Sequence, residues 1–307
     1  MSRTLRFCLV TTFYPPHHFG GDGVLVYRLA SALARRHHEV DVIYCVDSYR
    51  LFNRAPPPRH PPDHPNVRVH ALRSRLGPLS PVYTHQTGRP GPKRRGLARI
   101  LEDHAFDVIH YHNISLVGGP AVIALGRAAV RLFTAHDYWP VCPLSTLWQY
   151  GRRICTNRQC IRCGLHAGRP PQAWRATGLL ARALKRIDAF LCPSVFVMQI
   201  LRDHGLDLPY THLPNFVSEP ERIALDEAVA AMGPRYFLYA GRIEKHKGAD
   251  DAVAVFRHHD ASALWIAGEG KHEARLRRRA GGAPHIRFLG HQPRDALFAL
   301  YRGAQAV

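Results

Sequence analysis

The stretch YFLYAGRIEKHKG, residues 236–248, decides the fold of this chain. Its apolar, aromatic-rich start has the length of a strand and ends at Gly241, a basic loop follows, and residues 249 to 258 read as a helix. This pattern predicts a βα unit. Ligands of open α/β sheets bind beyond the carboxyl ends of the strands, where the next helix presents free N–H groups to an anion. We therefore expect an anion site in this loop.

Two cations in the loop suit a diphosphate. Arg242 can bind two oxygens in a fork, and Lys247 supplies a point charge. The chain has 42 Lys and Arg residues, of which five are lysines, and both Lys245 and Lys247 fall in this loop. The alternative is a solvated basic turn, because exposed charge is ordinary on loops.

Length and charge limit the classes of function that this chain can have. The 307 residues suffice for two domains, and the formal charge of +19 predicts an anionic partner such as nucleic acid, an acidic membrane face or a phosphorylated ligand. No helix-turn-helix or interleaved aromatic pattern supports specific nucleic-acid binding. The start of the chain reads as a strand and not as a signal peptide, and no apolar run is long enough to span a membrane. We expect a cytoplasmic protein.

The first half begins with another βα arrangement. A strand over residues 5 to 10 precedes Gly20-Gly21-Asp22-Gly23, which opens a helix through residue 36, and the strand at 39 to 46 completes a parallel βαβ unit. The glycines form either a ligand-binding loop or only a tight turn.

Polar side chains follow two later strands. The strand at 106 to 110 leads to His112 and Asn113, and the strand at 130 to 133 leads to His136 and Asp137. A core histidine is the ordinary interpretation, but His136 lies where the chain leaves the sheet, the part of such folds that holds ligands. We also predict helices over 120 to 129 and 172 to 186, and a charged helical stretch at 218 to 231.

Two segments are predicted to be loops. Residues 77 to 96 have little apolar content, and the basic run from Arg89 to Arg95 is interpreted as exposed, either simply solvated or in contact with an anionic acceptor or lipid head group. Residues 138 to 171 contain four of the seven cysteines. Their spacing allows a structural zinc site, free thiols, disulfides or an iron–sulfur cluster; the four are Cys142, Cys155, Cys160 and Cys163.

Taken together, these segments resemble the GT-B fold of the retaining family 4 glycosyltransferases, and the resemblance covers nearly the whole chain. Each motif is weak alone, but the ordered set is specific. The segments that carry it are Tyr14-Pro15-Pro16 with Gly20-Gly21, 106–113, 134–137, Pro193-Ser194, Leu213-Pro214-Asn215, Gly241-Arg242 with Lys247-Gly248, Gly268-x-Gly270, and Phe288-Leu289-Gly290.

The resemblance implies two Rossmann-like domains facing a cleft, with an acceptor-side domain at 1–212, a linker at 213–234 and a partial nucleotide-sugar domain at 235–307. It implies transfer of a hexose from a UDP- or GDP-sugar to a saccharide or lipid-linked acceptor, with retention and without a catalytic metal. A peripheral position at the inner membrane face would use the basic surface. A nucleotide-sugar or polyanion-binding remnant without activity is the alternative.

The resemblance also assigns roles to residues. His136, Arg242 and Lys247 look catalytic, with the two cations on the leaving diphosphate, where negative charge develops. His112, Asn113 and Asp137 look acceptor-side. The residues that resemble the donor site, besides the two cations, are Gly20, Gly21, Gly241, Gly268, Gly270, Phe288, Leu289 and Gly290.

One element of the family pattern is missing from the sequence. The resemblance implies an acidic E-x7-E segment whose carboxylates contact the sugar and the ribose, and residues 290 to 307 contain no such pair. We therefore expect a chain truncated inside its second domain, with incomplete donor binding.

Overall fold

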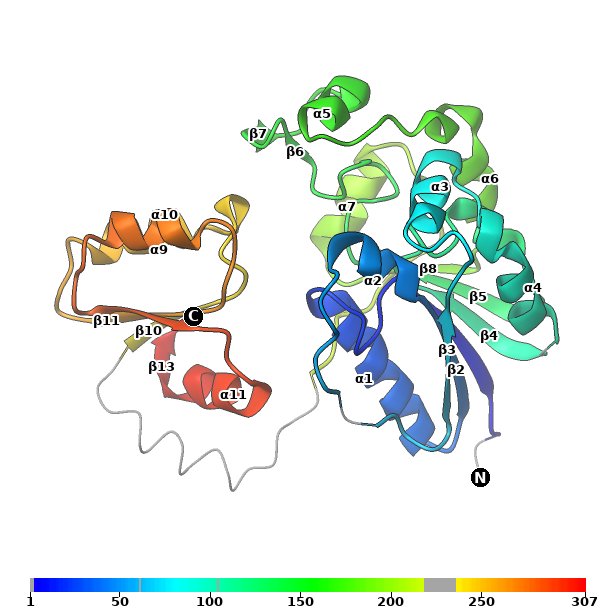
Figure 1. Cartoon of the computed structure of the whole chain (residues 1–307), viewed down its shortest axis with the longest axis horizontal. Coiled ribbons are helices and arrows are strands. Elements are labelled where there is room, and N and C mark those ends of the chain that lie inside the picture. Colours follow the sequence, from blue (N-terminus) through cyan, green and yellow to red (C-terminus); the bar gives the residue numbers. More distant parts are fainter. Residues whose placement is uncertain (1–2, 61, 104, 218–235) are drawn as a thin grey trace. The chain divides into compact units, whose positions relative to one another are not determined.

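The computed structural model describes residues 3–60, 62–103, 105–217 and 236–307. The chain divides into two compact units, Met1–Phe216 and Val217–Val307, drawn in Figure 1. Most of the predicted linker at 213–234, and the helical stretch predicted at 218–231, lie outside the described residues. Among the residues described, no helix is both long and apolar enough to cross a membrane.

The first unit contains a seven-stranded sheet in the order β3-β2-β1-β4-β5-β8-β9. All six neighbouring pairs are parallel. The strands predicted at 5–10, 39–46, 106–110 and 130–133 are confirmed to within one or two residues at each end. Their bounds are β1 (Arg6–Val10), β2 (Glu39–Cys45), β3 (Val67–Leu72), β4 (Phe106–Tyr111), β5 (Ala128–Thr134), β8 (Ala189–Cys192) and β9 (Tyr210–His212).

Both faces of this sheet are covered, which explains why its central strands are nearly continuous apolar runs. Leu9 of β1 packs with Val26 and Ala30 of helix α1 (Gly21–Arg35) in one core cluster. Cys8 and Val10 turn to the other face and join a second cluster. That face is covered by α4 (Arg94–Asp103), α6 (Leu179–Leu184) and α7 (Val195–Asp203). Ser194 caps α7, its side chain accepting a hydrogen bond from the Val197 amide at 3.2 Å.

The prediction of a loop at 77–96 is wrong. The structure contains α3 (Leu79–Thr87), the short 3-10 helix η1 (Gly91–Lys93) and the start of α4 there. Lys93, expected to be exposed, is buried, and its Nζ donates to Ser80 Oγ at 2.9 Å and Thr84 Oγ1 at 3.0 Å. The buried face of α3 is polar at these positions, so a search for apolar periodicity does not find it.

Other helix predictions also need correction. At 120–129 the structure has a 3-10 turn, η2 (Pro120–Ala124), followed by the start of β5. The helix predicted at 172–186 is split into η3 (Ala173–Thr177) and α6 by Gly178, whose φ of 68° ends the first piece. Helix α2 (Val46–Phe52) directly follows β2 and was not predicted.

The cysteine-containing segment is more ordered than a loop. It holds a two-stranded antiparallel hairpin, β6 (Trp148–Gln149) and β7 (Arg153–Ile154), and helix α5 (Cys160–His166). In Figure 1 these elements lie together above α7, away from the strands of the large sheet.

The second unit contains a parallel four-stranded sheet in the order β12-β11-β10-β13. Tyr236 of β10 stacks on Trp265 of β11 with ring centroids 3.8 Å apart, and its hydroxyl donates to the Leu300 carbonyl at 2.8 Å. The βα unit predicted at 236–258 is confirmed, and the alternation continues to the end of the sheet. The elements are β10 (Tyr236–Ala240), η4 (Lys245–Lys247), α9 (Ala249–Phe256), β11 (Ala263–Ala267), α10 (Glu273–Ala280), β12 (Ile286–Gly290), α11 (Arg294–Gly303) and β13 (Ala304–Ala306).

Candidate active site

The predicted site residues of the first unit follow three adjacent strands at the centre of its sheet. The chain runs from β1 outward to β2 and β3, and then returns to place β4 on the other side of β1. The carboxyl ends of β1 and β4 therefore flank a topological switch point, where doubly wound folds bind ligands. Gly20 and Gly21 follow β1, His112 and Asn113 follow β4, and His136 follows β5.

Histidines at this edge form a stacked group. His112 Nδ1 lies 2.9 Å from His136 Nε2, and His110 Nε2 lies 2.7 Å from Thr134 Oγ1. Burial, with the other histidines, lowers the pKa of His110 to about 3 and holds that of His112 well below its usual range. Burial also lowers the pKa of His136, although nearby Asp22 opposes this. All three rings are therefore neutral at pH 7.

His112 is predicted to be acceptor-side, but its side chain is only 3 % exposed and meets His136. Its Nε2 is buried, with no hydrogen-bond partner in the described part of the chain. In this structure His112 contacts His136 and is shielded from solvent. Reasoning along the sequence did not pair them, because 24 positions separate them.

Two carboxylates lie beside the histidines. Asn113 Nδ2 donates to Asp22 Oδ2 at 3.3 Å, which joins the turn after β4 to the start of α1. Asp137 accepts a hydrogen bond from the Trp139 amide at 2.8 Å. Burial, supported by the charge of Asp22 and opposed by that amide, raises the pKa of Asp137 to about 6. A small cavity of about 10 Å³ is lined by His112, Asn113, His136 and Asp137.

Two glycines at the start of α1 leave open space. A Cβ added at Gly20 or Gly21 would meet no atom within 4 Å, and Gly20 has a φ of 73°. Gly23 is different, because its Cβ would lie 2.9 Å from His18 Cβ. The first two glycines thus let a ligand approach the backbone, whereas the third permits close packing.

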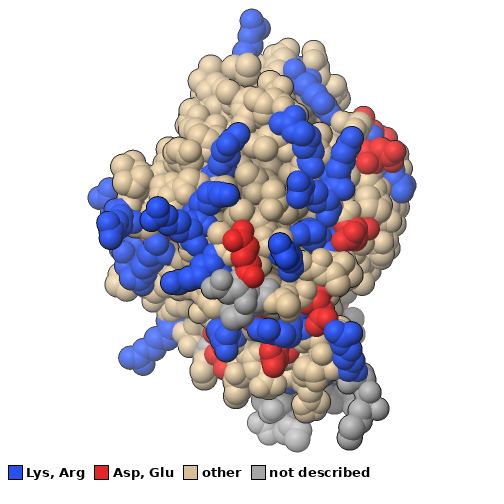
Figure 2. Space-filling view, turned by 90° about the vertical axis from the view of Figure 1, so that its right-hand side faces the viewer, with Lys and Arg blue, Asp and Glu red and all other residues tan. Residues whose placement is uncertain are grey.

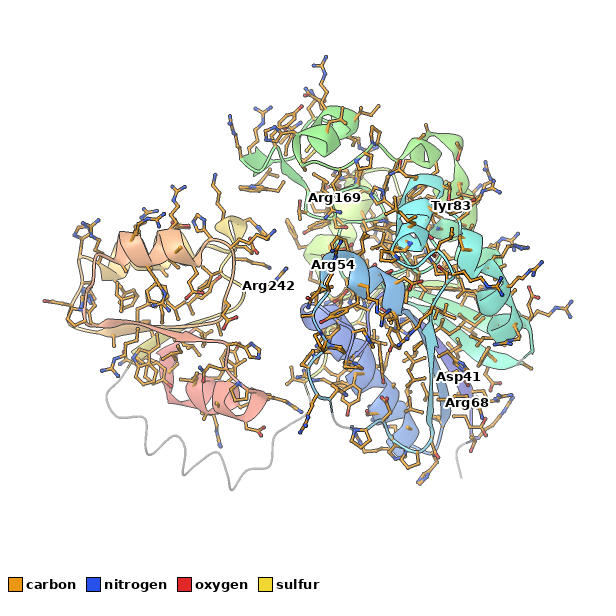
Figure 3. The ribbon with its side chains drawn as sticks, in the orientation of Figure 1. Asp41, Arg54, Arg68, Tyr83, Arg169 and Arg242 are labelled. Carbon is orange, nitrogen blue, oxygen red and sulfur yellow. The ribbon has the colours of Figure 1, made fainter. Side chains whose placement is uncertain are left out.

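In the second unit, β10 occupies the switch point, since β11 lies on one side of it and β13 on the other. Arg242 and Lys247 follow β10 and are exposed. Figure 3 shows Arg242 projecting from its loop away from the sheet. The Tyr239 hydroxyl lies 3.1 Å from the carbonyl oxygen of Arg242 and 3.4 Å from that of Lys247, so it ties both ends of the loop together.

The predicted glycines that follow β11, Gly268 and Gly270, hold this loop by close backbone approach. A Cβ at Gly268 would lie 1.9 Å from the Gly241 carbonyl oxygen, and one at Gly270 would lie 2.2 Å from that of Ile243. Backbone bonds join the same segments, from the Gly241 amide to the Ala267 carbonyl at 3.0 Å and from the Ile243 amide to the Glu269 carbonyl at 2.9 Å. These glycines therefore position the cationic loop.

Phe288 and Leu289 point into their own unit. Phe288 packs in one core cluster, with the Arg277 guanidinium 4.4 Å from its ring centroid, and Leu289 packs in another. Both side chains are half-buried in this packing.

The structure thus brings the predicted residues of each unit together at one sheet edge. Asp22 and Tyr239 were missed as site residues. Asp22 lies within the segment Gly20-Gly21-Asp22-Gly23, so its position in the sequence could have identified it as a site residue. For the four predicted zinc ligands, all thiols are free, and no three metal-binding side chains among the described residues already form a coordination group.

Residues 19–219 match the family described as Glycosyltransferase Family 4, and residues 222–307 match Glycosyl transferases group 1. The chain is 26 % identical to a glycogen synthase of Mycobacterium tuberculosis, over 99 % of this chain and 72 % of that protein. Two similar solved structures are WaaG, a glycosyltransferase involved in lipopolysaccharide biosynthesis (TM-score 0.59, 14 % identity, 98 % of this chain and 73 % of that one), and Anabaena HepE in complex with UDP-glucose (TM-score 0.58, 12 % identity, 98 % and 72 %).

The family match covers most of the first unit and the group 1 match most of the second, and the similar solved structures share the two-unit α/β architecture. The chain therefore belongs to Glycosyltransferase Family 4 and is a glycosyltransferase with the GT-B fold.

Proposed function

We propose that this glycosyltransferase moves a hexose from a UDP- or GDP-sugar to a saccharide or lipid-linked acceptor, with retention of configuration and without a catalytic metal. The observation that carries the proposal is the pair Arg242 and Lys247, exposed at the switch point of the second sheet and tied together by Tyr239. The Anabaena protein with the same fold binds UDP-glucose, which supports a nucleotide-sugar donor.

The two cations suit the charge change of the reaction. Breaking the bond between the sugar and the diphosphate leaves negative charge on the diphosphate oxygens. Groups fixed in place before the reaction stabilise that charge at little reorganisation cost. Arg242 offers the fork for two oxygens and Lys247 the point charge, so this pair can do what a divalent cation does elsewhere.

His136 is assigned to the transferred sugar. With His112 and His136 both neutral, one ring must donate the proton of their shared hydrogen bond. A buried N–H without a partner is rarer than a buried acceptor without one, which favours the lone pair at the orphaned His112 Nε2. His112 then donates from Nδ1, and His136 carries its own proton on Nδ1, ready to donate to a sugar hydroxyl.

The acceptor side of the proposal rests on charge. Arg94, Arg95 and Arg99 are exposed on α4. Figure 2 shows Lys and Arg gathered over the face of the first unit that carries α4, with few carboxylates among them. Such a surface attracts anionic lipid or a phosphate-linked acceptor, so we place the enzyme peripherally at the inner membrane face.

Calorimetric titration with UDP-glucose and GDP-mannose tests the donor site. Arg242→Ala and Lys247→Ala should each weaken binding at least tenfold, because a charge-assisted contact contributes about 1.5–3 kcal/mol. Lys245→Ala is a matched control, since it removes the same charge from the same loop and should change the affinity less than threefold. Equal losses in all three variants would mean that the ligand is attracted to the basic loop in general, and would contradict specific binding of the diphosphate by Arg242 and Lys247.

Transfer itself needs a separate assay. Radiolabelled donor with a lipid-linked saccharide acceptor should yield product in the presence of chelator, and NMR of that product should show the anomeric configuration of the donor. Binding without hydrolysis or transfer would support the alternative, a nucleotide-sugar-binding protein. Inversion, or a requirement for added divalent metal, would overturn that part of the proposal.

A further inference from the structure

The four cysteines of the segment after the active-site strand surround one cavity. Cys142, Cys155, Cys160 and Cys163 line a space of about 20 Å³ together with apolar side chains, among them Leu147. All four thiols are free and partly buried. A space of this volume holds one or two water-sized occupants, so it suits a single ion better than a cluster of several irons.

The backbone between these cysteines is tightly constrained. Ser145, Leu147 and Tyr150 all have positive φ, at 63°, 50° and 53°. Residues other than glycine rarely adopt this conformation, and such outliers persist only where surrounding structure holds them. The Cys155 amide donates to the Leu147 carbonyl at 2.8 Å, which brings Cys155 back toward the start of the segment.

One backbone group already points at a sulfur. The Tyr150 amide lies 3.3 Å from Cys163 Sγ and donates to it. An N–H donor stabilises a thiolate more than a thiol, and outer-shell donors of this kind orient metal-bound ligands.

Cations balance the charge of such a site. Four thiolates on one divalent ion carry a net charge of about −2. Arg175 packs against the rings of Trp139 and Trp174, 5.4 and 4.7 Å from their centroids, and lies within electrostatic reach of Cys142 and Cys160. Arg158 acts on Cys155 and Cys160.

The four thiols line one cavity, but their sulfurs are not yet gathered round one point. No coordination group is preformed among the described residues, so an ion must draw the sulfurs inward by side-chain rotation and a small movement of the segment.

We propose that Cys142, Cys155, Cys160 and Cys163 bind one zinc ion as a structural site, independent of Arg242 and Lys247 in the second unit. The four thiols lose their protons to solvent, four Zn–S bonds form, the waters of the aqueous ion leave, and no electron is transferred. The ion fixes a segment that begins a few residues after His136 and Asp137.

Metal analysis of protein purified without chelator tests the proposal. The expected result is about one zinc per chain, and replacement by Co²⁺ should give the sulfur-to-cobalt charge-transfer band and intense visible bands of a tetrahedral thiolate site. Cys142→Ala and Cys163→Ala should lower zinc affinity at least tenfold in competition with a chelator. Cys192→Ala, which removes a buried thiol outside the segment, should retain full zinc.

Measurements on the unaltered chain keep the test decisive if a variant fails to fold. Less than about half an equivalent of zinc, with no cobalt charge-transfer band, would overturn the site. Bound iron with visible absorbance would show an iron–sulfur cluster instead of zinc. An intact mass lower than that of the reduced chain by four hydrogens would show two disulfides instead of zinc. Four thiols that react freely both before and after chelation would leave free cysteines only.

Discussion

At the scale of single residues, the hydroxyl of Tyr239 connects the strand to the cationic loop. We expect Tyr239→Phe to weaken UDP-sugar binding about threefold to tenfold, because removing one hydrogen bond of about 1 kcal/mol frees the carbonyl groups of Arg242 and Lys247. Calorimetry measures the affinity and thermal unfolding the stability, which should change little. Tyr301→Phe, on an exposed tyrosine of α11, is the control. An unchanged donor affinity in Tyr239→Phe would show that the loop needs no such tie.

Asp137 makes stability depend on pH. Burial raises its pKa from 3.8 to about 6, so the folded chain binds this proton more tightly than the unfolded chain. The stability contributed by the protonated form is complete below about pH 4 and is lost as the pH rises through 6. Asp137→Asn keeps an oxygen for the Trp139 amide but cannot ionise. It should therefore gain stability relative to the parent at pH 7.5, by at most about 3 kcal/mol since the group is partly solvated, and little at pH 4.

Urea unfolding at several pH values measures this difference. Asp207→Asn, at an exposed carboxylate, should give a nearly constant offset from the parent across the range. If Asp137→Asn follows the pH dependence of the parent, the carboxyl group is not desolvated in the way the structure indicates.

The sequence predicted these sites by position and not by contact. His136 and Arg242 were found because each follows a strand, and that placement can be read along the chain. The bond from His112 to His136 and the tie from Tyr239 depend on how side chains cross between strands and loops, which a one-dimensional pattern does not carry. A pairing of this kind requires the register of β4 with β5.

At the scale of elements, the loops after β10 and β11 form one backbone-bonded layer. Gly270→Ala should destabilise the second unit by about 2–3 kcal/mol, because the new Cβ would lie 2.2 Å from the Ile243 carbonyl oxygen, which also accepts a bond from the His272 amide. The affinity for the nucleotide-sugar donor should fall together with the stability. Thermal unfolding and calorimetry measure the two effects.

Gly96→Ala is the matched control for that change. Gly96 lies within α4, and its added Cβ would meet Leu72 Cδ2 at an ordinary 3.5 Å, so stability should stay the same or rise slightly. A Gly270→Ala protein as stable as the parent would show that the loops can separate without cost.

Elements were predictable where the apolar pattern was strong. The strands of both sheets were found because burial on both faces makes them apolar throughout. Helix α3 was missed because Ser80, Thr84 and Lys93 satisfy one another inside the protein. The break at Gly178 was missed because helical periodicity continues on both sides of it.

At the scale of the whole molecule, each unit carries its polar groups at the switch point of its own sheet. The sequence predicted parallel βα units, but strand order depends on which side of the first strand each later strand joins. The order β12-β11-β10-β13 places Arg242 at the centre of the sheet. Strand β10 is hydrogen-bonded to a neighbour on each side, which suits a group that must be fixed before charge develops.

The charge of the first unit gives the last prediction. Replacing Arg94, Arg95 and Arg99 of α4 by alanine should weaken binding to phosphatidylglycerol vesicles at least tenfold, because each basic residue near an anionic surface contributes about 1 kcal/mol. The parent should also lose affinity as salt rises. Arg275→Ala with Arg278→Ala, which removes exposed charge from α10, is the control and should reduce binding no more than twofold. Vesicle co-sedimentation measures both. An equal loss per charge removed in the two variants would show that net charge alone attracts the chain, since the position of the arginines matters only if α4 faces the membrane.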